Sequence, residues 1–407
     1  MEFAADVSWD LPSLAPGATA LVDVTVNGAQ IGYLAQGSLV SSTRFIELDA
    51  AVWSNNTVRV IARNISAATF NLASAICGAE SCVDMAEFGL AKEPLFRQVL
   101  RLNHGIPSHD TFSRLFRLLD PAAFHTAFQR FMAAFAEAAT VDGVIALDGK
   151  TARRSFDRAR SGSPLHLVSA WACDARLVLG QRAVAEGGNE IDALLELLAM
   201  LDLEGRIVTA DAMHCQRRTA KAVLERRADY VLALKATQRE LLADVRLLLD
   251  DPQAPPESEA QTMDGDHGRI ETRRASVLAD IDYLQRAHSF PGLAAIARIT
   301  ASREISGKTS TAVRYFLLSR PMTAERLLAV VRAHWGIENS LHWVLDVIMD
   351  EDQARTRRDH GPENLALLRR LALNMLRANT AKGSVRLKIK RAGWRDDFLL
   401  SILAQLR

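Results

Sequence analysis

The chain has 407 residues, of which 49% are hydrophobic and 24% are charged. This composition excludes collagen-like and intrinsically disordered proteins. A chain of this length buries enough apolar surface to fold without disulfides or a structural metal. The sequence shows neither an apolar run of membrane-spanning length nor the basic and apolar regions of a secretory signal. With only four cysteines, we therefore expect reduced thiols in a cytoplasm and no membrane partner.

Charge is distributed unevenly along the chain. The formal net charge is +1, yet residues 1–80 hold 3 basic against 7 acidic residues, and residues 353–407 hold 13 basic against 4 acidic residues. A basic C-terminal part favours a polyanionic partner such as nucleic acid. A solvated surface is the commoner explanation of a charge run, so charge alone does not decide between the two.

The first 76 residues differ from the rest. Three short segments rich in Val, Ile and Thr are separated by the turn signals NG, QGS and SNN. That pattern predicts strands and a small all-β module. Residues 84–140 instead place apolar side chains at helical spacing, which predicts helices.

Residues 141–235 alternate strands with helices in the order β-β-β-α-β-α-β. Asp174 and Ala175 form the expected hairpin turn between the second and third strands. The pattern predicts an α/β fold with a mixed sheet that begins antiparallel. After a helix at 237–250, a Pro-rich joint leads into a β-rich segment, and the chain ends in helices.

The sequence has no nucleotide-binding signature. Neither GxxxxGK[ST] nor GxGxxG occurs, so we expect no nucleotide cofactor. Exchange of one DNA phosphodiester for another requires none, so this absence leaves DNA chemistry open.

Two aspartates each close an apolar strand. Asp148 ends the strand in GVIALDGK, and Asp211 ends the strand in GRIVTADA. If these strands are neighbours, their carboxylates lie side by side and repel each other unless a cation lies between them. Mg²⁺ takes oxygen ligands, and a pair of such ions clamps the attacking and leaving oxygens of a phosphodiester. Asp is also common in turns, and spacing alone favours that simpler interpretation.

One helical stripe adds a third acidic group. His334, Glu338, His342 and Asp346 recur at every fourth position, so they share one face of a helix. An inward-facing polar stripe needs partners, and Glu338 opposite Asp148 across a metal would have one. An amphipathic helix with a solvated face is an equal alternative. His334, Glu338 and His342 could also bind zinc, although their spacing is not HExxH.

Many segments over residues 84–407 resemble, in the same order, one group of bacterial insertion-sequence transposases. These are the DDE-type enzymes of the ISAs-type family, which includes the H-repeat-associated proteins. The resemblance implies an α/β fold with a ribonuclease-H-like mixed sheet, a β-rich insertion and C-terminal helices. The segments are HGIPSHDTFSRLFRLLDP, ALDGKTAR, LHLVSAWA, LVLGQRAVAEGGNEI, IVTADAMHCQ, DYVLALKATQ, HGRIETRR, HWGIENSLHWVLDVIMDEDQAR, GPENLALLRRLALNMLR and KRAGWRDDFLL.

The resemblance implies catalytic and metal-binding roles for Asp148, Asp211 and Glu338, with Mg²⁺ as the metal and Mn²⁺ as a substitute. It implies that the protein cuts DNA at the ends of its element and that the freed 3′-hydroxyl attacks target DNA. The partners would be element ends, target DNA and a second copy in a homodimer, in a nucleoid-associated cytoplasmic location. It also implies DNA-contacting or site-shaping residues, and with the basic C-terminal segment these are Lys150, His334, Trp335, Asn339, His342, Lys388, Lys390 and Arg391.

The N-terminal region departs from the resemblance. Related chains begin with helices before HGIPSHDTF, whereas here residues 84–103 precede that motif and an acidic, β-rich segment stands in front. We therefore predict an in-frame fusion, and the alternative function is an inactive transposase remnant or a fusion with a structural β module. The expected domains are an all-β module (1–76), a shortened helical part (84–140), the first part of the catalytic core (141–250), a β-rich insertion (251–322), core helices with the third acid (323–380) and a basic tail (381–407).

Overall fold

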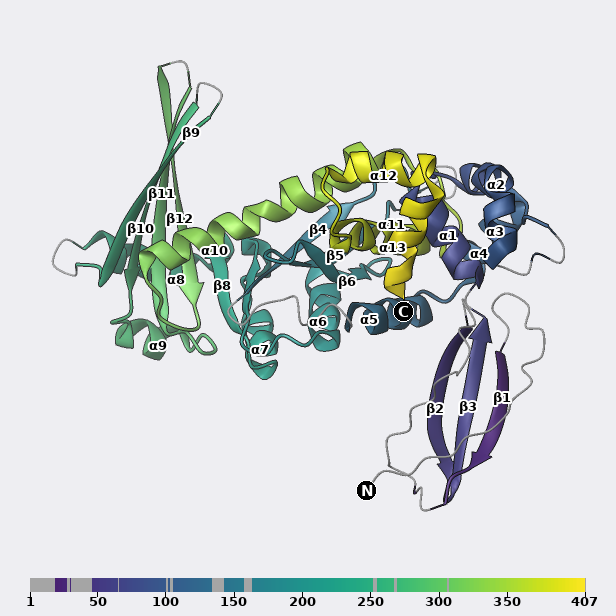
Figure 1. The fold of residues 1–407 in the computed structure, drawn as a ribbon. Helices are drawn as coiled ribbons and strands as arrows, with labels where there is room; N and C mark the ends of the chain where they lie inside the picture. Colours follow the sequence, from purple (N-terminus) through teal and green to yellow (C-terminus); the bar gives the residue numbers. More distant parts are fainter. Residues whose placement is uncertain are drawn as a thin grey trace. The chain divides into compact units, whose positions relative to one another are not determined.

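The computed structural model divides the chain into two units (Figure 1). One unit combines Met1–Leu115 with Ala378–Arg407, and the other is Phe116–Arg377. The structure describes residues 19–27, 30, 46–64, 66–99, 102, 105–133, 143–156, 163–251, 255–266, 269–305 and 307–406.

The first unit contains a three-stranded antiparallel sheet in the order β1-β3-β2. Asn56, between the second and third strands, has a φ of 62°, a left-handed conformation that Asn tolerates. The predicted strands are present, whereas residues 1–18 and 31–45 of the predicted module lie outside the described residues. The strands are β1 (Thr19–Thr25), β2 (Ile46–Ser54) and β3 (Thr57–Asn64).

Helices begin earlier than the sequence predicts. Helix α1 spans Ser66–Ile76, inside the segment expected to be all-β, so the strands end with β3. Leu72 is 2% exposed and Ala73 and Ile76 are fully buried. The segment is rich in Ala, which favours helix, but it is apolar on nearly every side, so no amphipathic stripe revealed it.

Three further helices follow, of which the last extends past Leu115. Helix α2 begins with a capping box, in which the Ser81 hydroxyl accepts the Asp84 N–H and the Asp84 carboxylate accepts the Ser81 N–H. The helices are α2 (Cys82–Ala91), α3 (Glu93–Val99) and α4 (His109–Leu118).

The segment predicted as a basic tail is instead helical. It forms α12 (Val385–Trp394) and α13 (Asp396–Leu403), followed by the 3₁₀ turn η8 (Ala404–Leu406). Helix α13 contacts α1, and Leu399 and Ile402 are fully buried. The prediction of a tail is wrong. The basic residues of this segment suggested a solvated chain, whereas its apolar residues are buried against helices that lie far away in the sequence.

The second unit is built on a nine-stranded sheet in the order β6-β5-β4-β7-β8-β12-β11-β10-β9 (Figure 1). Strands β4, β7 and β8 are mutually parallel, and β5 and β6 run antiparallel beside β4. The first five strands therefore lie in the order 3-2-1-4-5, which confirms the expected ribonuclease-H-like mixed sheet. They are β4 (Val144–Thr151), β5 (His166–Ala172), β6 (Leu177–Ala183), β7 (Ile207–Ala210) and β8 (Asp229–Leu234).

The β-rich segment extends this same sheet. The end of β12 pairs antiparallel with β8, from Tyr315 opposite Leu234 to Leu318 opposite Val231. The first of its strands was not predicted, because its Asp, Glu and Gly residues have low β propensity; pairing with β10 along its length stabilises it. The strands are β9 (Ser258–Asp266), β10 (Arg269–Leu278), β11 (Ala295–Ile305) and β12 (Lys308–Leu318).

Helices cover both faces of the sheet (Figure 1). Ile145 and Leu147 of β4 pack with Leu194 on one face, and Val144 packs with Leu327 on the other. All five are at most 3% exposed, and each fully buried leucine contributes about 1.5–3 kcal/mol by leaving water. Burial on both faces explains why these strands are continuous apolar runs.

The helices of the second unit precede, connect and follow its strands. Among the described residues, no helix is both long and apolar enough to cross a membrane. The helices are α5 (Pro121–Ala133), α6 (Glu190–Met200), η3 (Ala212–His214), α7 (Arg217–Glu225), η4 (Ala236–Gln238), α8 (Arg239–Asp250), α9 (Asp282–His288), α10 (Ala324–Ile337), η5 (Glu338–His342), η6 (Val344–Ile348), η7 (Glu351–Gln353) and α11 (Gly361–Ala378).

Candidate active site

Asp148 and Asp211 lie on two neighbouring parallel strands. Asp148 is in β4, and Asp211 follows directly after β7. The register pairs Leu147 with Ala210, so the residues that come next, the two aspartates, are also neighbours. The strands that carry Asp148 and precede Asp211 are therefore adjacent, as the predicted metal site requires.

Glu338 reaches the same face of the sheet on a helix that changes type. Helix α10 starts after Thr323, whose hydroxyl accepts the Arg326 N–H, and ends at Ile337. Glu338 then begins the π-helical segment η5, which η6 follows. Turns of the π type hold one more residue between hydrogen-bonded groups than α turns, are rare, and occur frequently at functional sites.

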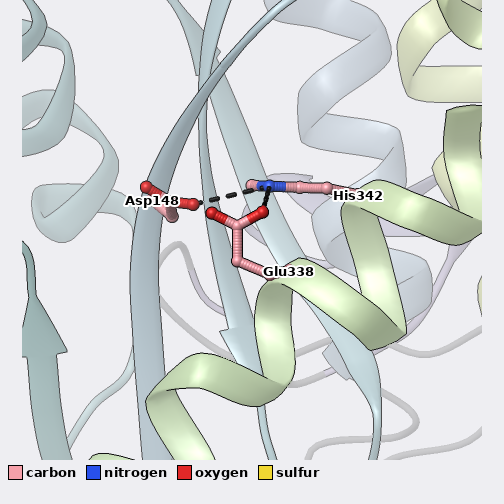
Figure 2. Close-up of side chains that lie close together, drawn as sticks. All are labelled: Asp148, Glu338 and His342. Carbon is pink, nitrogen blue, oxygen red and sulfur yellow. Dashed lines mark ion pairs between the residues drawn. The ribbon is translucent and has the colours of Figure 1, made fainter. Parts of the chain in front are cut away.

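Three side chains converge into a candidate metal site (Figure 2). His342 Nδ1 lies 3.4 Å from Asp148 Oδ2 and 3.6 Å from Glu338 Oε2. One ligand atom from each residue lies within 4.8 Å of the other two. The group contains two of the three predicted acids, with His342 in place of Asp211. Carboxylate oxygens suit Mg²⁺ and Mn²⁺, and an imidazole nitrogen suits Zn²⁺.

The acids of this group repel one another. Burial raises the pKa of Asp148 to about 6, and the charges of Glu338 and Asp211 act in the same direction. The Asp148 side chain is 18% exposed, and its Oδ1 accepts the Gly149 N–H at 2.9 Å. A cation at this point would favour the ionised carboxylates and offset their repulsion.

His342 is neutral at pH 7. Burial lowers its pKa to about 4, and the positive charges of Arg370 and Lys150 add to this effect. Its Nε2 atom is buried and has no hydrogen-bond partner among the described residues. Because the neutral imidazole is the form that binds metals, the geometry favours a role inside the site over the alternative of a DNA contact.

Asp211 lies outside the converging group and faces His334. The His334 ring places Nε2 3.6 Å from Asp211 Oδ1 and Nδ1 2.9 Å from Thr209 Oγ1. His334 holds the pKa of Asp211 below its usual range, against the opposing effect of burial. His334 is therefore placed to orient an ionised Asp211.

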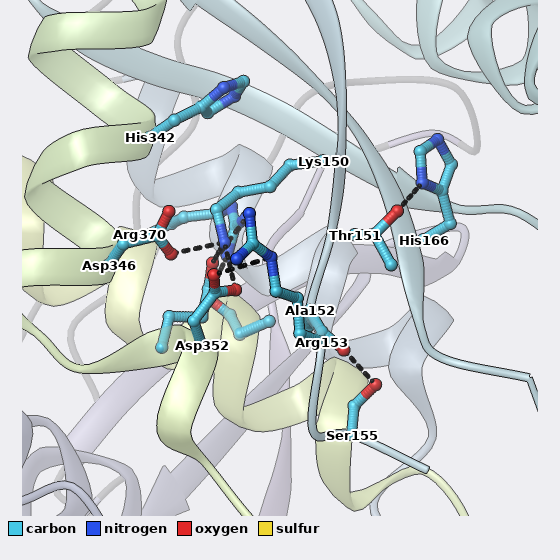
Figure 3. Close-up of polar contacts among 12 residues, drawn as sticks. Lys150, Thr151, Ala152, Arg153, Ser155, His166, His342, Asp346, Asp352 and Arg370 are labelled. Atoms are coloured by element: carbon cyan, nitrogen blue, oxygen red, sulfur yellow. Dashed lines mark hydrogen bonds and ion pairs between the residues drawn. The ribbon is translucent and has the colours of Figure 1, made fainter.

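Lys150 belongs to a buried ion cluster (Figure 3). Its Nζ atom lies 2.6 Å from Asp346 Oδ1, 3.2 Å from Glu351 Oε2 and 3.2 Å from Asp352 Oδ1. Arg370, which is fully buried, pairs with Glu351 at 2.7 Å. The prediction of a DNA contact for Lys150 is corrected, because three carboxylates enclose its ammonium group. The cluster links β4 to the helices that follow Glu338.

Two other predicted DNA contacts lie on the surface beside the site. Trp335 is 41% exposed, and the Arg314 guanidinium lies 4.8 Å from its ring centroid. Asn339 is exposed in the π-helical segment. Both side chains are therefore accessible to a partner in this structure.

The three basic residues predicted in α12 differ in accessibility. Lys390 is exposed, and the half-buried Arg391 donates to the Lys382 carbonyl at 2.6 Å. Lys388 is 6% exposed and donates to the Asn379 carbonyl at 2.6 Å. The expectation that Lys388 contacts DNA is corrected, because its ammonium group is enclosed within its own unit.

Two polar clusters were not predicted from the sequence. One is the Lys150 cluster, and its signal was the acidic run DED at 350–352. The other joins Glu190 to His166 and His214. Its signal was the NEI segment, which the resemblance includes without assigning it a role.

The strand order, with acids on β4 and after β7, defines a ribonuclease-H-like α/β protein. Residues 139–375 match the family model described as "Transposase DDE domain", and the chain therefore belongs to the DDE transposase family. Residues 63–132 match a second model, described as "DDE_Tnp_1-associated". The associated region thus begins at residue 63 and includes α1.

Relatives match the chain over most of its length. It is 34% identical over 342 residues to the H repeat-associated putative transposase YhhI of Escherichia coli (strain K12), covering 82% of this chain and 90% of that protein. It is 43% identical over 253 residues to an uncharacterized protein in the dhlA 3′ region of Xanthobacter autotrophicus, covering 61% and 85%. The solved piggyBac transposase synaptic complex with hairpin DNA aligns at a TM-score of 0.39 and 13% identity, over 84% of this chain and 71% of that chain. The strand order, and not this last likeness, supports the fold assignment.

Proposed function

We propose that the protein is a metal-dependent transposase that cuts DNA at the ends of an insertion sequence and joins it to target DNA. The observation that supports this most directly is the convergence of Asp148, Glu338 and His342, with Asp211 on the neighbouring strand. Family membership gives the class of protein, and the chemistry rests on these four side chains.

Asp148, Asp211 and Glu338 would hold Mg²⁺ or Mn²⁺. The fit is good, because a cation offsets the repulsion that helps to raise the pKa of Asp148 to about 6. When bound, such a metal lowers the pKa of water and stabilises charge on phosphate oxygens. Glu338 is 54% exposed and Asp211 is 50% exposed, so a phosphate from solvent reaches both. His342 adds a nitrogen ligand that also admits Zn²⁺.

The surrounding residues would position these acids. His334 keeps Asp211 ionised and oriented, since it lies within ion-pair distance and is itself hydrogen-bonded to Thr209. The Lys150 cluster fixes the distance between β4 and the helix that carries Glu338. Rigid placement matters because a displacement of about 1 Å reduces catalysis by about 100-fold.

We propose a DNA-binding surface along β12 and Trp335. Among the described residues, β12 pairs with β8 only from Tyr315 onward, so residues 308–314 form an open, exposed edge. That edge has Lys308 and Arg314 at its ends and three hydroxyl residues between them. Basic side chains, hydroxyls and free backbone N–H groups all bind phosphate oxygens. The exposed Trp335 ring offers a stacking platform for a base.

Cleavage of a plasmid that carries the gene's own flanking DNA tests the proposal. With Mg²⁺ or Mn²⁺, we expect cuts at the element's ends by the native chain and at least a 100-fold loss in Asp211→Asn. Asp250→Asn is the control, because Asp250 forms an exposed ion pair with Arg298 away from the acids. Cleavage that survives Asp211→Asn would overturn the assignment.

The second candidate is an inactive remnant fused to a structural β module. Residues 1–62 precede both matched regions, and Asp211 does not join the converging group. A folded native chain that cuts no flanking DNA with either metal would favour this candidate. A terminal repeat in the DNA upstream of codon 63 would support the fusion. The homodimer and the nucleoid location stay predictions.

A further inference from the structure

Glu190, the first residue of α6, lies between two imidazoles. Its Oε2 pairs with His166 Nε2 at 2.7 Å, and its Oε1 pairs with His214 Nε2 at 2.9 Å. A carboxylate only accepts hydrogen bonds, so each Nε2–H donates. His214 is 1% exposed, and its Nδ1 has no hydrogen-bond partner among the described residues. One carboxylate therefore orients both imidazole rings. For His214 this hydrogen bond is the one that its side chain makes to the described residues.

Each imidazole lies close to an element that carries or follows a predicted catalytic acid. His166 of β5 lies opposite Thr151 of β4, and its Nδ1 is 2.7 Å from Thr151 Oγ1 (Figure 3). His214 ends η3, three residues after Asp211. Glu190 thus connects the strand of Asp148 with the turn that follows Asp211.

Gly149 shows how closely this carboxylate lies against the strand. A Cβ atom at residue 149 would lie 2.6 Å from Glu190 Cδ and 2.8 Å from His166 Nε2, closer than real Cβ contacts. Successive strand residues point to opposite faces of a sheet. The Glu190 carboxylate therefore lies directly behind Asp148, in the space that the absent Gly149 side chain leaves.

We propose that Glu190 is a positioning residue that holds Asp148 and Asp211 in register from the face of the sheet opposite their carboxylates. The half-buried Glu190 carboxylate accepts two charge-assisted hydrogen bonds, which stabilise this arrangement more than neutral ones would. The inference rests on the proposed function for the identity of the acids, but the clamp itself is a property of the fold. It predicts that loosening Glu190 moves the acids without removing any ligand.

Glu190→Gln tests the clamp in the full-length protein. The amide keeps the shape of the carboxylate but removes its charge and one of its two acceptor oxygens, so the charge-assisted pairing with His166 and His214 is weakened. Asp192→Asn is the matched control, because Asp192 lies in the same turn of α6 and pairs with Arg218 instead. Two quantities are measured: Mn²⁺ affinity by electron paramagnetic resonance, and amide hydrogen exchange of residues 148–151 and 211–215.

In Glu190→Gln we expect the Mn²⁺ dissociation constant to rise about tenfold, as for other residues that orient metal ligands. Exchange in the two segments should accelerate about tenfold, with neither change in Asp192→Asn. Unchanged exchange in Glu190→Gln would overturn the clamp, whatever the metal result. If the native chain binds no Mn²⁺ while exchange still accelerates in the variant, the clamp stands and the proposed metal chemistry fails.

Discussion

Replacing Arg370 with Met tests the buried ion cluster beneath the candidate site. Arg370 is fully buried, Glu351 is 2% exposed, and the two side chains pair at 2.7 Å. Burial alone would raise the pKa of Glu351, but Arg370 and Lys150 outweigh burial and lower it to about 2. Arg370→Met leaves a buried carboxylate that pairs with Lys150, an ammonium group that also pairs with Asp346 and Asp352.

The expected loss of stability is about 3 kcal/mol. A pKa lowered from 4.5 to about 2 corresponds to about 3 kcal/mol at about 1.4 kcal/mol per unit, the net result of attraction by Arg370 and Lys150 against the cost of burial. Removing one partner of a buried pair costs about 3–5 kcal/mol, which agrees. Because the pKa of Glu351 is depressed, its stabilising contribution is fully present above pH 4.5 and disappears as the pH falls through 2. The difference between the native chain and the variant should therefore be largest at neutral pH and shrink in acid.

Urea unfolding at pH 7 and pH 4 measures this difference. Arg117→Met is the control, since Arg117 and Asp359 form a pair at 2.6 Å with side chains 35% and 50% exposed, and such pairs contribute about 0–1 kcal/mol. Adding Glu351→Leu to Arg370→Met should recover most of the loss, because it removes the unpaired buried charge. A loss in Arg370→Met no larger than that in Arg117→Met would refute this reasoning.

Lowering the pH from 7.5 to 5 should weaken Mn²⁺ binding, because Asp148 has a pKa raised to about 6 and then binds a proton in competition with the metal. Calorimetric titration measures the affinity, and an affinity that does not change with pH would contradict the prediction. Lys390→Ala should reduce the slope of log DNA affinity against log salt by about 0.9, and Lys388→Met should leave the slope unchanged, as measured by fluorescence anisotropy. Asn374→Leu should lower the free energy of unfolding by about 2–6 kcal/mol, as measured in urea. The N–H and the carbonyl of Val178 each lose a buried hydrogen-bond partner, at about 1–3 kcal/mol each. A loss below about 1 kcal/mol would contradict this, because both groups would then have found other partners.

Local pattern was sufficient to predict the α/β order and to place Asp148 and Asp211 at strand ends. Their catalytic role was implied by the family resemblance, since spacing alone favoured turns. Apolar runs that end in Asp148 and Asp211 are visible in the sequence, and parallel strands of a ribonuclease-H-like sheet bring such ends together. The spacing of four residues between His334, Glu338 and His342 likewise indicated that they share one face of a helix. Each of these predictions depends on residues close together in the chain, where periodicity reports conformation directly.

Other features depend on partners that local pattern cannot supply. Strand β9 is polar and forms because β10 pairs with it, and α1 is apolar on nearly every side, so neither showed a local signal. The same holds for the π-helical turns after Ile337. The sequence predicts an ordinary α-helix there. It does not predict the π-helical hydrogen bonds, because their register depends on packing as well as on side-chain spacing.

By itself, the sequence determined the strands of the large sheet other than β9, the candidate acids and the family to which they point. Only the tertiary structure decided what the neighbouring charges do. Lys150 is a basic residue beside an acid in the sequence, but its partner Asp352 lies 202 positions away. Glu190 meets His166 and His214, each 24 positions away, on the far face of the sheet. A buried charge is stable only when it is paired. Strand order and helix packing determine which partner lies within reach, and spacing along the chain does not.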